Sequence, residues 1–216
     1  MQSPATTAVW DLPTRLFHWS LLPLFIAAWV SAEEGYMEVH EWCGYTVLVL
    51  VGFRILWGFA GSSHSRFSSF LRGPAAVLEY FKRGEWSGEG HNPAGGWSVV
   101  AMLALLLSQG VSGLFNEDDI AFSGPLAHLA GDLADSVNEW HELNFNLLLA
   151  MTGVHVIAVL LYLRRGKNLV RPMVTGGMAG NRTVTASPWL ALALLAASAA
   201  LLWWLLSLAP KPAPFL

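Results

Sequence analysis

Five long apolar blocks constrain the fold of this chain, because each is long enough to cross a lipid bilayer. A membrane-spanning helix needs about 20 mostly apolar residues, and the blocks cover residues 12–32, 36–60, 97–115, 135–163 and 188–209. Charged residues make up only 12% of the chain, about half the share of a soluble domain. Strand-like alternation is absent, and helices satisfy their own backbone groups in lipid. The sequence therefore predicts an all-α integral membrane protein.

The composition excludes several kinds of site. With a single cysteine, the chain has no disulfide framework, multi-cysteine zinc site, iron–sulfur cluster or C-x-x-C-H haem attachment. A formal net charge of −3 gives no support to nucleic-acid binding.

The first block has a recognisable helix start, since Asp11 precedes it as a cap and Pro13 stands in its first turn. Residues 30–32 (Val-Ser-Ala) resemble a signal-peptide cleavage site, but the segment before them holds Asp11 and only one basic residue, Arg15. We therefore expect this block to remain as a helix. Residues 61–95 and 164–187 are interpreted as loops.

Charge predicts the orientation of the helices. Lys and Arg near the helix ends gather on one side: Arg15, Arg54, Arg66, Arg72, Lys82, Arg83, Arg164, Arg165, Lys167, Arg171 and Arg182. The opposite loops, 33–38 and 116–134, contain neither residue type, and eleven acids lie in them and in the adjoining helix starts. The positive-inside rule places the N-terminus in the cytoplasm, and five crossings then put the C-terminus outside.

Four of the seven histidines lie inside the predicted spans, where ionisable residues are uncommon and usually functional: His18, His40, His141 and His155. His141 and His155 are 14 residues apart on one helix. They therefore share a face within about 40° and are separated by about 21 Å along the axis. His18 matches His155 in depth near the cytoplasmic side, and His40 matches His141 near the outside.

Two histidine pairs stacked across a membrane suit two b-type haems, each held by imidazoles from facing helices. The sequence thus predicts a four-helix haem-binding bundle with a fifth, C-terminal transmembrane helix. Alternatives are hydrogen bonding between helices, a proton relay and zinc. A proton relay is disfavoured because the sequence places no Asp or Glu at mid-membrane. A zinc site is disfavoured because no further zinc ligands lie at the same depth as either histidine pair.

Other residues are candidates for contacts with the haems. Gly44 and Gly52 fall four and eight residues after His40, on about its face, where a missing side chain would admit a flat macrocycle. Close helix packing explains them equally well. Arg15 and Arg54 are candidates for pairing with propionates of the inner haem. As ordinary cytoplasmic anchors they need no such role, and we favour that interpretation for Arg54.

At this point the motifs resemble those of a known family, the bacterial di-haem b-type cytochromes related to the cytochrome b subunit of nickel–iron hydrogenase. The resemblance covers about residues 9–178, with matching strings VWDLPTRLFHW at 9–19, HEWCGY at 40–45, FRILWG at 53–58, GHNPAGG at 90–96, HE at 141–142, GVH at 153–155, NLV at 168–170 and VTG at 174–176. It implies that four helices hold two stacked haems in the bacterial inner membrane, with axial ligation by the same four histidines.

The resemblance also implies a quinone site near the inner haem, at the loop before the third helix. The matching residues are His91, which could exchange a proton with a quinone oxygen, and Asn92, which could hydrogen-bond it. The alternative is a turn in which Asn92 and Pro93 serve only the backbone.

The fifth helix lies outside the family core, so residues 1–180 are expected to form the haem domain and residues 181–216 an added helix and tail. It has no histidine, and its small residues suit association with a partner, a second copy or the bundle itself.

These features predict electron transfer between membrane quinone and a periplasmic redox partner, such as a c-type cytochrome or a hydrogenase-like subunit. The acidic outer loops would attract a basic protein, although a solvated face explains those acids too. One alternative is a stand-alone quinone reductase that uses, for example, superoxide. Another is a membrane anchor or transporter without haem.

Overall fold

The computed structural model describes residues 6–8, 10–84, 91–117, 122–179 and 185–209. Within them the membrane-length helices are α1 (Leu12–Glu33), α2 (Met37–Ala60), α5 (Pro93–Phe115), α6 (Ala134–Arg164) and α8 (Pro188–Leu206). They correspond to the five predicted blocks, and the predicted fold class is confirmed. The shorter elements are β1 (Thr6–Ala8), η1 (Ser63–Ser65), α3 (Phe67–Phe70), α4 (Pro74–Arg83), η2 (Ala127–Leu129), η3 (Gly131–Leu133), α7 (Val170–Thr175) and β2 (Gly177–Ala179).

The helix α1 begins as its sequence predicts. Asp11 is the N-cap, and its Oδ1 atom accepts a hydrogen bond of 2.9 Å from the backbone N–H of Thr14, while a proline occupies the first turn. This cap satisfies one of the free backbone donors at the helix start. It also fixes where the following residues of α1 lie along the bundle.

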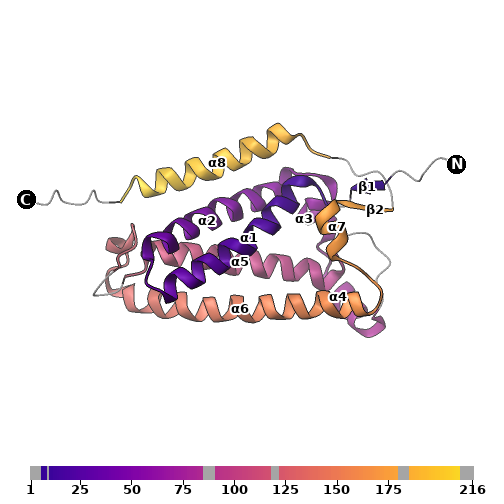
Figure 1. Ribbon diagram of the computed structural model, residues 1–216, viewed down its shortest axis with the longest axis horizontal. Helices are drawn as coiled ribbons and strands as arrows, with labels where there is room; N and C mark the ends of the chain where they lie inside the picture. Colours follow the sequence, from indigo (N-terminus) through magenta and orange to yellow (C-terminus); the bar gives the residue numbers. More distant parts are fainter. Residues whose placement is uncertain (1–5, 9, 85–90, 118–121, 180–184, 210–216) are drawn as a thin grey trace, which may run out of the picture.

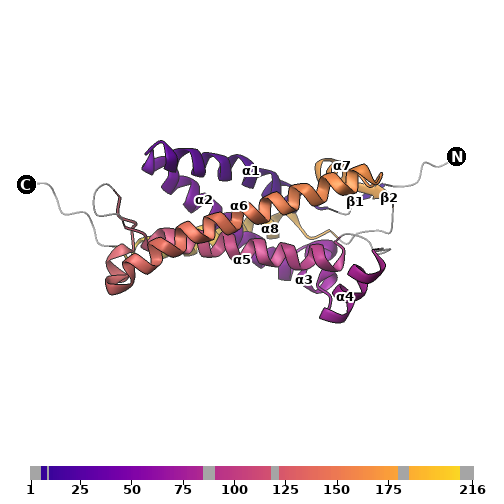
Figure 2. The same cartoon turned by 90° about the horizontal axis from the view of Figure 1, so that it is seen from below.

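The long helices lie side by side along the length of the molecule (Figure 1), and their contacts follow one another as an open ring. α1 packs on α2, α2 on α5, and α5 on α6. Between α6 and α1 the contact is made by aromatic side chains, since the ring of Phe145 lies 5.9 Å from that of Phe25 and 5.7 Å from that of Trp29. Figure 2 shows α6 running obliquely across the bundle.

The fully buried core lies around α2 rather than at the centre of the ring. Val51 and Trp57 have no exposed surface, and they pack with Phe17 of α1, Leu103 of α5 and Ala191 of α8. α8 therefore covers the outer side of α2, as Figure 1 shows. The alanines at positions 193, 196, 197 and 200 are exposed on α8. Association of α8 with a second copy of the chain through these residues stays a prediction.

The interpretation of residues 61–95 and 164–187 as loops is wrong in part. The first segment contains η1, α3 and α4, and the second contains α7 and β2. Pro74 at the start of α4 and Gly84 in the left-handed conformation after it are ordinary helix-boundary signals. β1 and β2 pair antiparallel, from Thr6 opposite Ala179 to Ala8 opposite Gly177, a contact between distant segments that local patterns do not predict.

Candidate functional site

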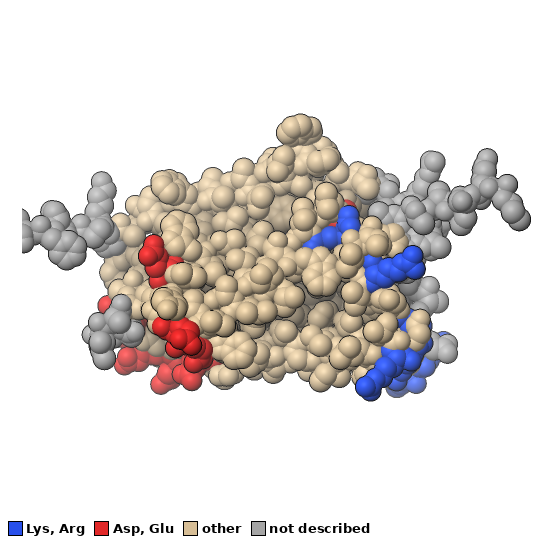
Figure 3. Space-filling view, in the orientation of Figure 1, with Lys and Arg blue, Asp and Glu red and all other residues tan. Residues whose placement is uncertain are grey.

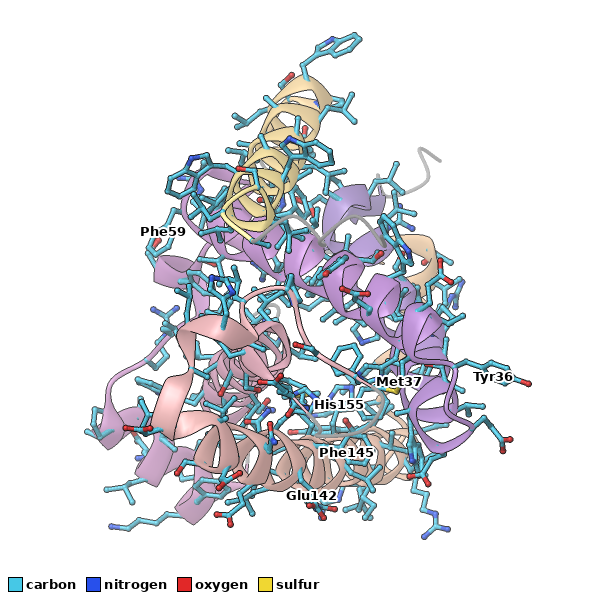
Figure 4. The ribbon with its side chains drawn as sticks, turned by 90° about the vertical axis from the view of Figure 1, so that its left-hand side faces the viewer. Tyr36, Met37, Phe59, Glu142, Phe145 and His155 are labelled. Atoms are coloured by element: carbon cyan, nitrogen blue, oxygen red, sulfur yellow. The ribbon has the colours of Figure 1, made fainter. Side chains whose placement is uncertain are left out.

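The structure brings His18 and His155 together near one end of the bundle. His18 lies in the second turn of α1, seven residues after its cap, and His155 lies nine residues before the end of α6 at Arg164. Their ring centroids are 6.2 Å apart. We call them the inner pair. In Figure 4, His155 and Phe145 project from α6 toward the α1–α2 side of the bundle.

His40 and His141 form a second pair near the opposite end, with ring centroids 6.3 Å apart. His40 stands in the first turn of α2, and His141 lies in the second turn of α6. We call them the outer pair. Both pairings are those expected from depth alone, although their role as ligands stays a prediction.

The ring spacing suits one metal ion between each pair. A metal–imidazole bond is about 2 Å long and a ring nitrogen lies roughly 1.15 Å from its centroid, so two imidazoles on opposite sides of one metal have centroids about 6.3 Å apart. Among the described residues no cluster of three or more His, Cys, Asp or Glu side chains could hold a metal. The site type that fits is therefore a two-histidine one, whose remaining ligands come from a cofactor such as haem.

Both outer histidines are oriented by hydrogen bonds from their Nδ1 atoms. His40 Nδ1 lies 2.8 Å from the carbonyl oxygen of Ala28 in α1, and His141 Nδ1 lies 2.9 Å from Ser112 Oγ in α5. Outer-shell acceptors of this kind fix the tautomer and ring orientation of metal-binding histidines. Gly113 adds room, since a Cβ there would lie 3.1 Å from Cε1 of the His141 ring.

Sequence reasoning missed these supporting residues. Ser112 is one of several polar residues near the outer end of α5, with Ser108 and Gln109, and its match in depth to His141 is the only signal that singles it out. The Ala28 carbonyl carries no signal, because every residue has one.

Around the inner pair several buried polar atoms have no hydrogen-bond partner among the described residues. They are His18 Nδ1, Arg15 Nε, Arg54 Nη1 and His91 Nδ1. Unpaired buried donors are rare in folded proteins. A carboxylate-bearing cofactor would supply acceptors for the two arginines of this set, so Arg15 and Arg54 fit a haem whose propionates lie here.

The two arginines differ from expectation in instructive ways. Arg54 is only 3% exposed and its guanidinium lies 5.5 Å from the Phe67 ring centroid, so its interpretation as a surface anchor is wrong. The reason is that α3 folds back over this part of α2. Arg15 donates a 2.6 Å hydrogen bond from Nη1 to the carbonyl oxygen of Val174 in α7, which leaves its Nε available.

The two candidate glycines have different surroundings. A Cβ at Gly44 would meet nothing within 4 Å, whereas a Cβ at Gly52 would lie 3.2 Å from Ser198 Oγ of α8. A side chain at Gly52 would therefore point toward α8, which favours the helix-packing interpretation, and contact of Gly52 with a haem face stays a prediction. Eight residues rotate the helix by about 80° beyond two turns, which is enough to turn Gly52 from the interior to α8.

His91 is enclosed by aromatic rings, with centroid distances of 4.6 Å to Trp10 and 4.8 Å to Phe70. Burial, and after it the nearby Arg54 charge and the inner pair, lowers the pKa of His91 to about 4. The ring is then neutral at neutral pH. It suits a hydrogen-bond donor to a quinone better than a source of protons.

Asn92 has the structural role that the alternative interpretation gave it. It is the N-cap of α5, with Oδ1 accepting a 2.7 Å hydrogen bond from the N–H of Gly95. Its Nδ2 donates at 2.9 Å to the hydroxyl of Tyr162, which also hydrogen-bonds Tyr80. Burial and the Tyr162 hydrogen bond raise the pKa of Tyr80 to about 12. One amide hydrogen of Asn92 remains for another partner.

Charge is segregated between the two ends of the molecule. Figure 3 shows Asp and Glu side chains at the end near the outer pair and Lys and Arg at the other end, with an uncharged surface between them. Asp11 is an acid at the basic end that is buried there, 7% exposed. Burial tends to raise the pKa of Asp11, but hydrogen bonds from Ser62, Thr14 and Ser65 outweigh it and lower that pKa.

Comparison with known proteins gives one family. The model of the prokaryotic cytochrome b561 family matches residues 9–176, which include all four paired histidines, His91 and Asn92. No curated protein and no solved structure matches the chain.

Proposed function

The chain belongs to the prokaryotic cytochrome b561 family, and from this premise we propose that two b haems, one at each histidine pair, carry its electrons across the membrane. Membership itself establishes a multi-pass membrane protein that binds b haem and transfers electrons. The resemblance predicted from the sequence motifs is thereby confirmed. The number of haems, their ligands and the redox partners belong to the proposal.

The observation that carries the proposal is the matched spacing of the two pairs. Ring centroids 6.2 Å and 6.3 Å apart suit the same coordination at both depths. Two imidazoles at each site would leave a bound haem no open iron position for oxygen, and the haem would then supply single-electron transfer. Phe145, Phe25 and Trp29 fill part of the interval between the pairs.

The charge of the two ends supports an orientation. With the basic end in the cytoplasm, the outer pair faces the periplasm of a bacterial inner membrane, and the C-terminus lies on that side. The acidic surface around the outer pair suits a basic periplasmic redox protein, such as a c-type cytochrome, through long-range attraction.

The quinone site of the proposal lies near the inner pair. His91 supplies a neutral N–H donor and Asn92 its remaining amide hydrogen, both at the start of α5. Arg54 and Arg15 hold the propionates of the inner haem. Residues 1–180 form the haem domain, and α8 is an addition that covers α2.

The purified protein tests the proposal through its haem content and spectrum. We expect two haems b per chain in a pyridine haemochrome assay. Low-spin ferric signals in electron paramagnetic resonance would reflect two axial imidazoles at each iron. One haem per chain, or high-spin iron at either site, would contradict it.

A further inference from the structure

The hydrogen bonds of the outer pair determine which nitrogen carries the proton. The Ala28 carbonyl can only accept, so Nδ1 of His40 is the donor. Ser112 Oγ lies 3.1 Å from the Gln109 carbonyl and donates to it, so the same oxygen accepts from His141 Nδ1. Both outer imidazoles therefore donate from Nδ1 and keep a lone pair on Nε2. Such bonds raise the basicity of an imidazole ligand.

The inner pair lacks these acceptors. His18 Nδ1 is fully buried without a partner, and within the described ranges no side chain or backbone group hydrogen-bonds the His155 ring. Its imidazoles are therefore the weaker electron donors of the two pairs.

A buried positive charge adds to this difference. Arg54 follows His40 by 14 residues on α2, as His155 follows His141 on α6, so it lies about 21 Å from the outer depth and level with the inner pair. It is 3% exposed, and no described carboxylate forms an ion pair with it, although Asp11 lies near enough to interact with its charge. In the proposed function its partner is a propionate of the inner haem, whose negative charge it offsets. The Asp11 oxygens instead accept from Thr14, Trp57 and Ser65.

From these contacts we infer that the chain itself gives the two sites different reduction potentials, with Ser112 and the Ala28 carbonyl lowering that of the outer site and Arg54 raising that of the inner site. More basic ligands stabilise ferric iron, whereas a nearby cation in a medium of low dielectric constant stabilises the reduced state. The inference rests on the proposed function.

Electron transfer then runs downhill from the outer site to the inner one. In each transfer one electron leaves the outer site, which is oxidised, and reduces the inner site, with no bond made or broken. The donor is a one-electron redox protein at the acidic end. Two transfers and two protons from the cytoplasmic side reduce one quinone to a quinol at the basic end.

Potentiometric titration of the full-length holoprotein tests the inference, with optical detection of the two haems. Variants that lack one haem, His141→Ala and His155→Ala, assign each step to a site. In the unaltered protein we expect the inner site to titrate at the higher potential. Ser112→Ala is expected to raise the outer potential and leave the inner one in place.

Ser98→Ala is the matched control, because Ser98 also lies on α5 and also donates to the carbonyl oxygen three residues earlier, that of Gly95. It is expected to shift neither potential. Arg54→Gln is expected to lower the inner potential, and Arg54→Lys to restore most of it. If Arg54→Gln loses the inner haem, the inference is tested by the shift of the outer potential in Ser112→Ala and by the order of the two potentials in the unaltered protein.

Any of three results would overturn the inference while two haems remain bound. The first is an outer potential at or above the inner one, and the second is no rise of the outer potential in Ser112→Ala. The third is an equal fall of the inner potential in Arg54→Gln and Arg54→Lys. Failure of the proposed function would look different. It would appear earlier, as a haem content below two per chain in the unaltered protein.

Discussion

Gly52 of α2 faces Ser198 of α8 so closely that a Cβ at Gly52 would lie 3.2 Å from the serine hydroxyl oxygen. The fifth helix is therefore fitted to the bundle through a residue without a side chain. Gly44, two turns earlier on the same helix, faces open space about 40° from the direction of His40. The two glycines thus have separable roles.

Leucine at each glycine should separate haem binding from helix packing. Gly44→Leu is expected to lose the outer haem without loss of thermal stability in the haem-free protein, because leucine favours the helix over glycine by up to about 1 kcal/mol. Gly52→Leu is expected to keep both haems and lose stability, because the new side chain displaces α8. The ratio of haem to protein and the thermal midpoint in detergent measure both effects. If Gly44→Leu still bound two haems, the outer haem would not occupy the open space beside Gly44.

Acid should destabilise the protein through His91. Its folded pKa of about 4 lies below the ordinary value of 6.5, so between these values the unfolded chain binds more protons. Stability from this group is complete above pH 6.5 and is lost as the pH falls toward 4, by about 2 kcal/mol between pH 7 and pH 5.

Thermal midpoints at pH 7 and pH 5 check this prediction. The decrease in the thermal midpoint is expected to be larger in the unaltered protein than in His91→Gln, which has no titratable side chain at this position. Equal decreases in the two proteins would contradict the assigned burial of His91.

Asn92 combines the cap of α5 with the proposed quinone contact, and two substitutions distinguish these roles. Asn92→Ser keeps a capping oxygen and removes the amide, whereas Asn92→Ala removes both and is expected to cost about 1 kcal/mol more in stability. Both variants are expected to slow reoxidation of the reduced protein by a short-chain quinone. If Asn92→Ser were reoxidised by the quinone at the normal rate, Asn92 would have no quinone contact and would serve only as the cap of α5 and as a hydrogen-bond donor to Tyr162.

The helix positions and the histidine pairs could be predicted because both depend on regular geometry. A helix rises by a constant amount per residue, so depth can be counted from a cap such as Asp11 or from a basic end such as Arg164. The same counting places Arg54 level with the inner pair.

Burial and orientation of single side chains could not be predicted in this way. Arg54 is covered because α3 brings Phe67 over it, and α3 lies in a segment that was interpreted as a loop. The direction of Gly52 depends on a rotation that accumulates over the eight residues after Gly44. The pairing of β1 with β2 and the bond from Arg15 to Val174 join segments more than 150 residues apart, for which local patterns carry no signal.

In the proposed arrangement each haem is held by one histidine from each side of the bundle, and four single substitutions test this arrangement. His40→Ala and His141→Ala are expected to lose the same haem. The haem that remains should then have the same spectrum and reduction potential in both variants. His18→Ala and His155→Ala are expected to lose the other haem, and His128→Ala, which changes an exposed side chain of η2, is expected to keep both haems. Loss of different haems within one pair, or two haems in all four variants, would contradict the account.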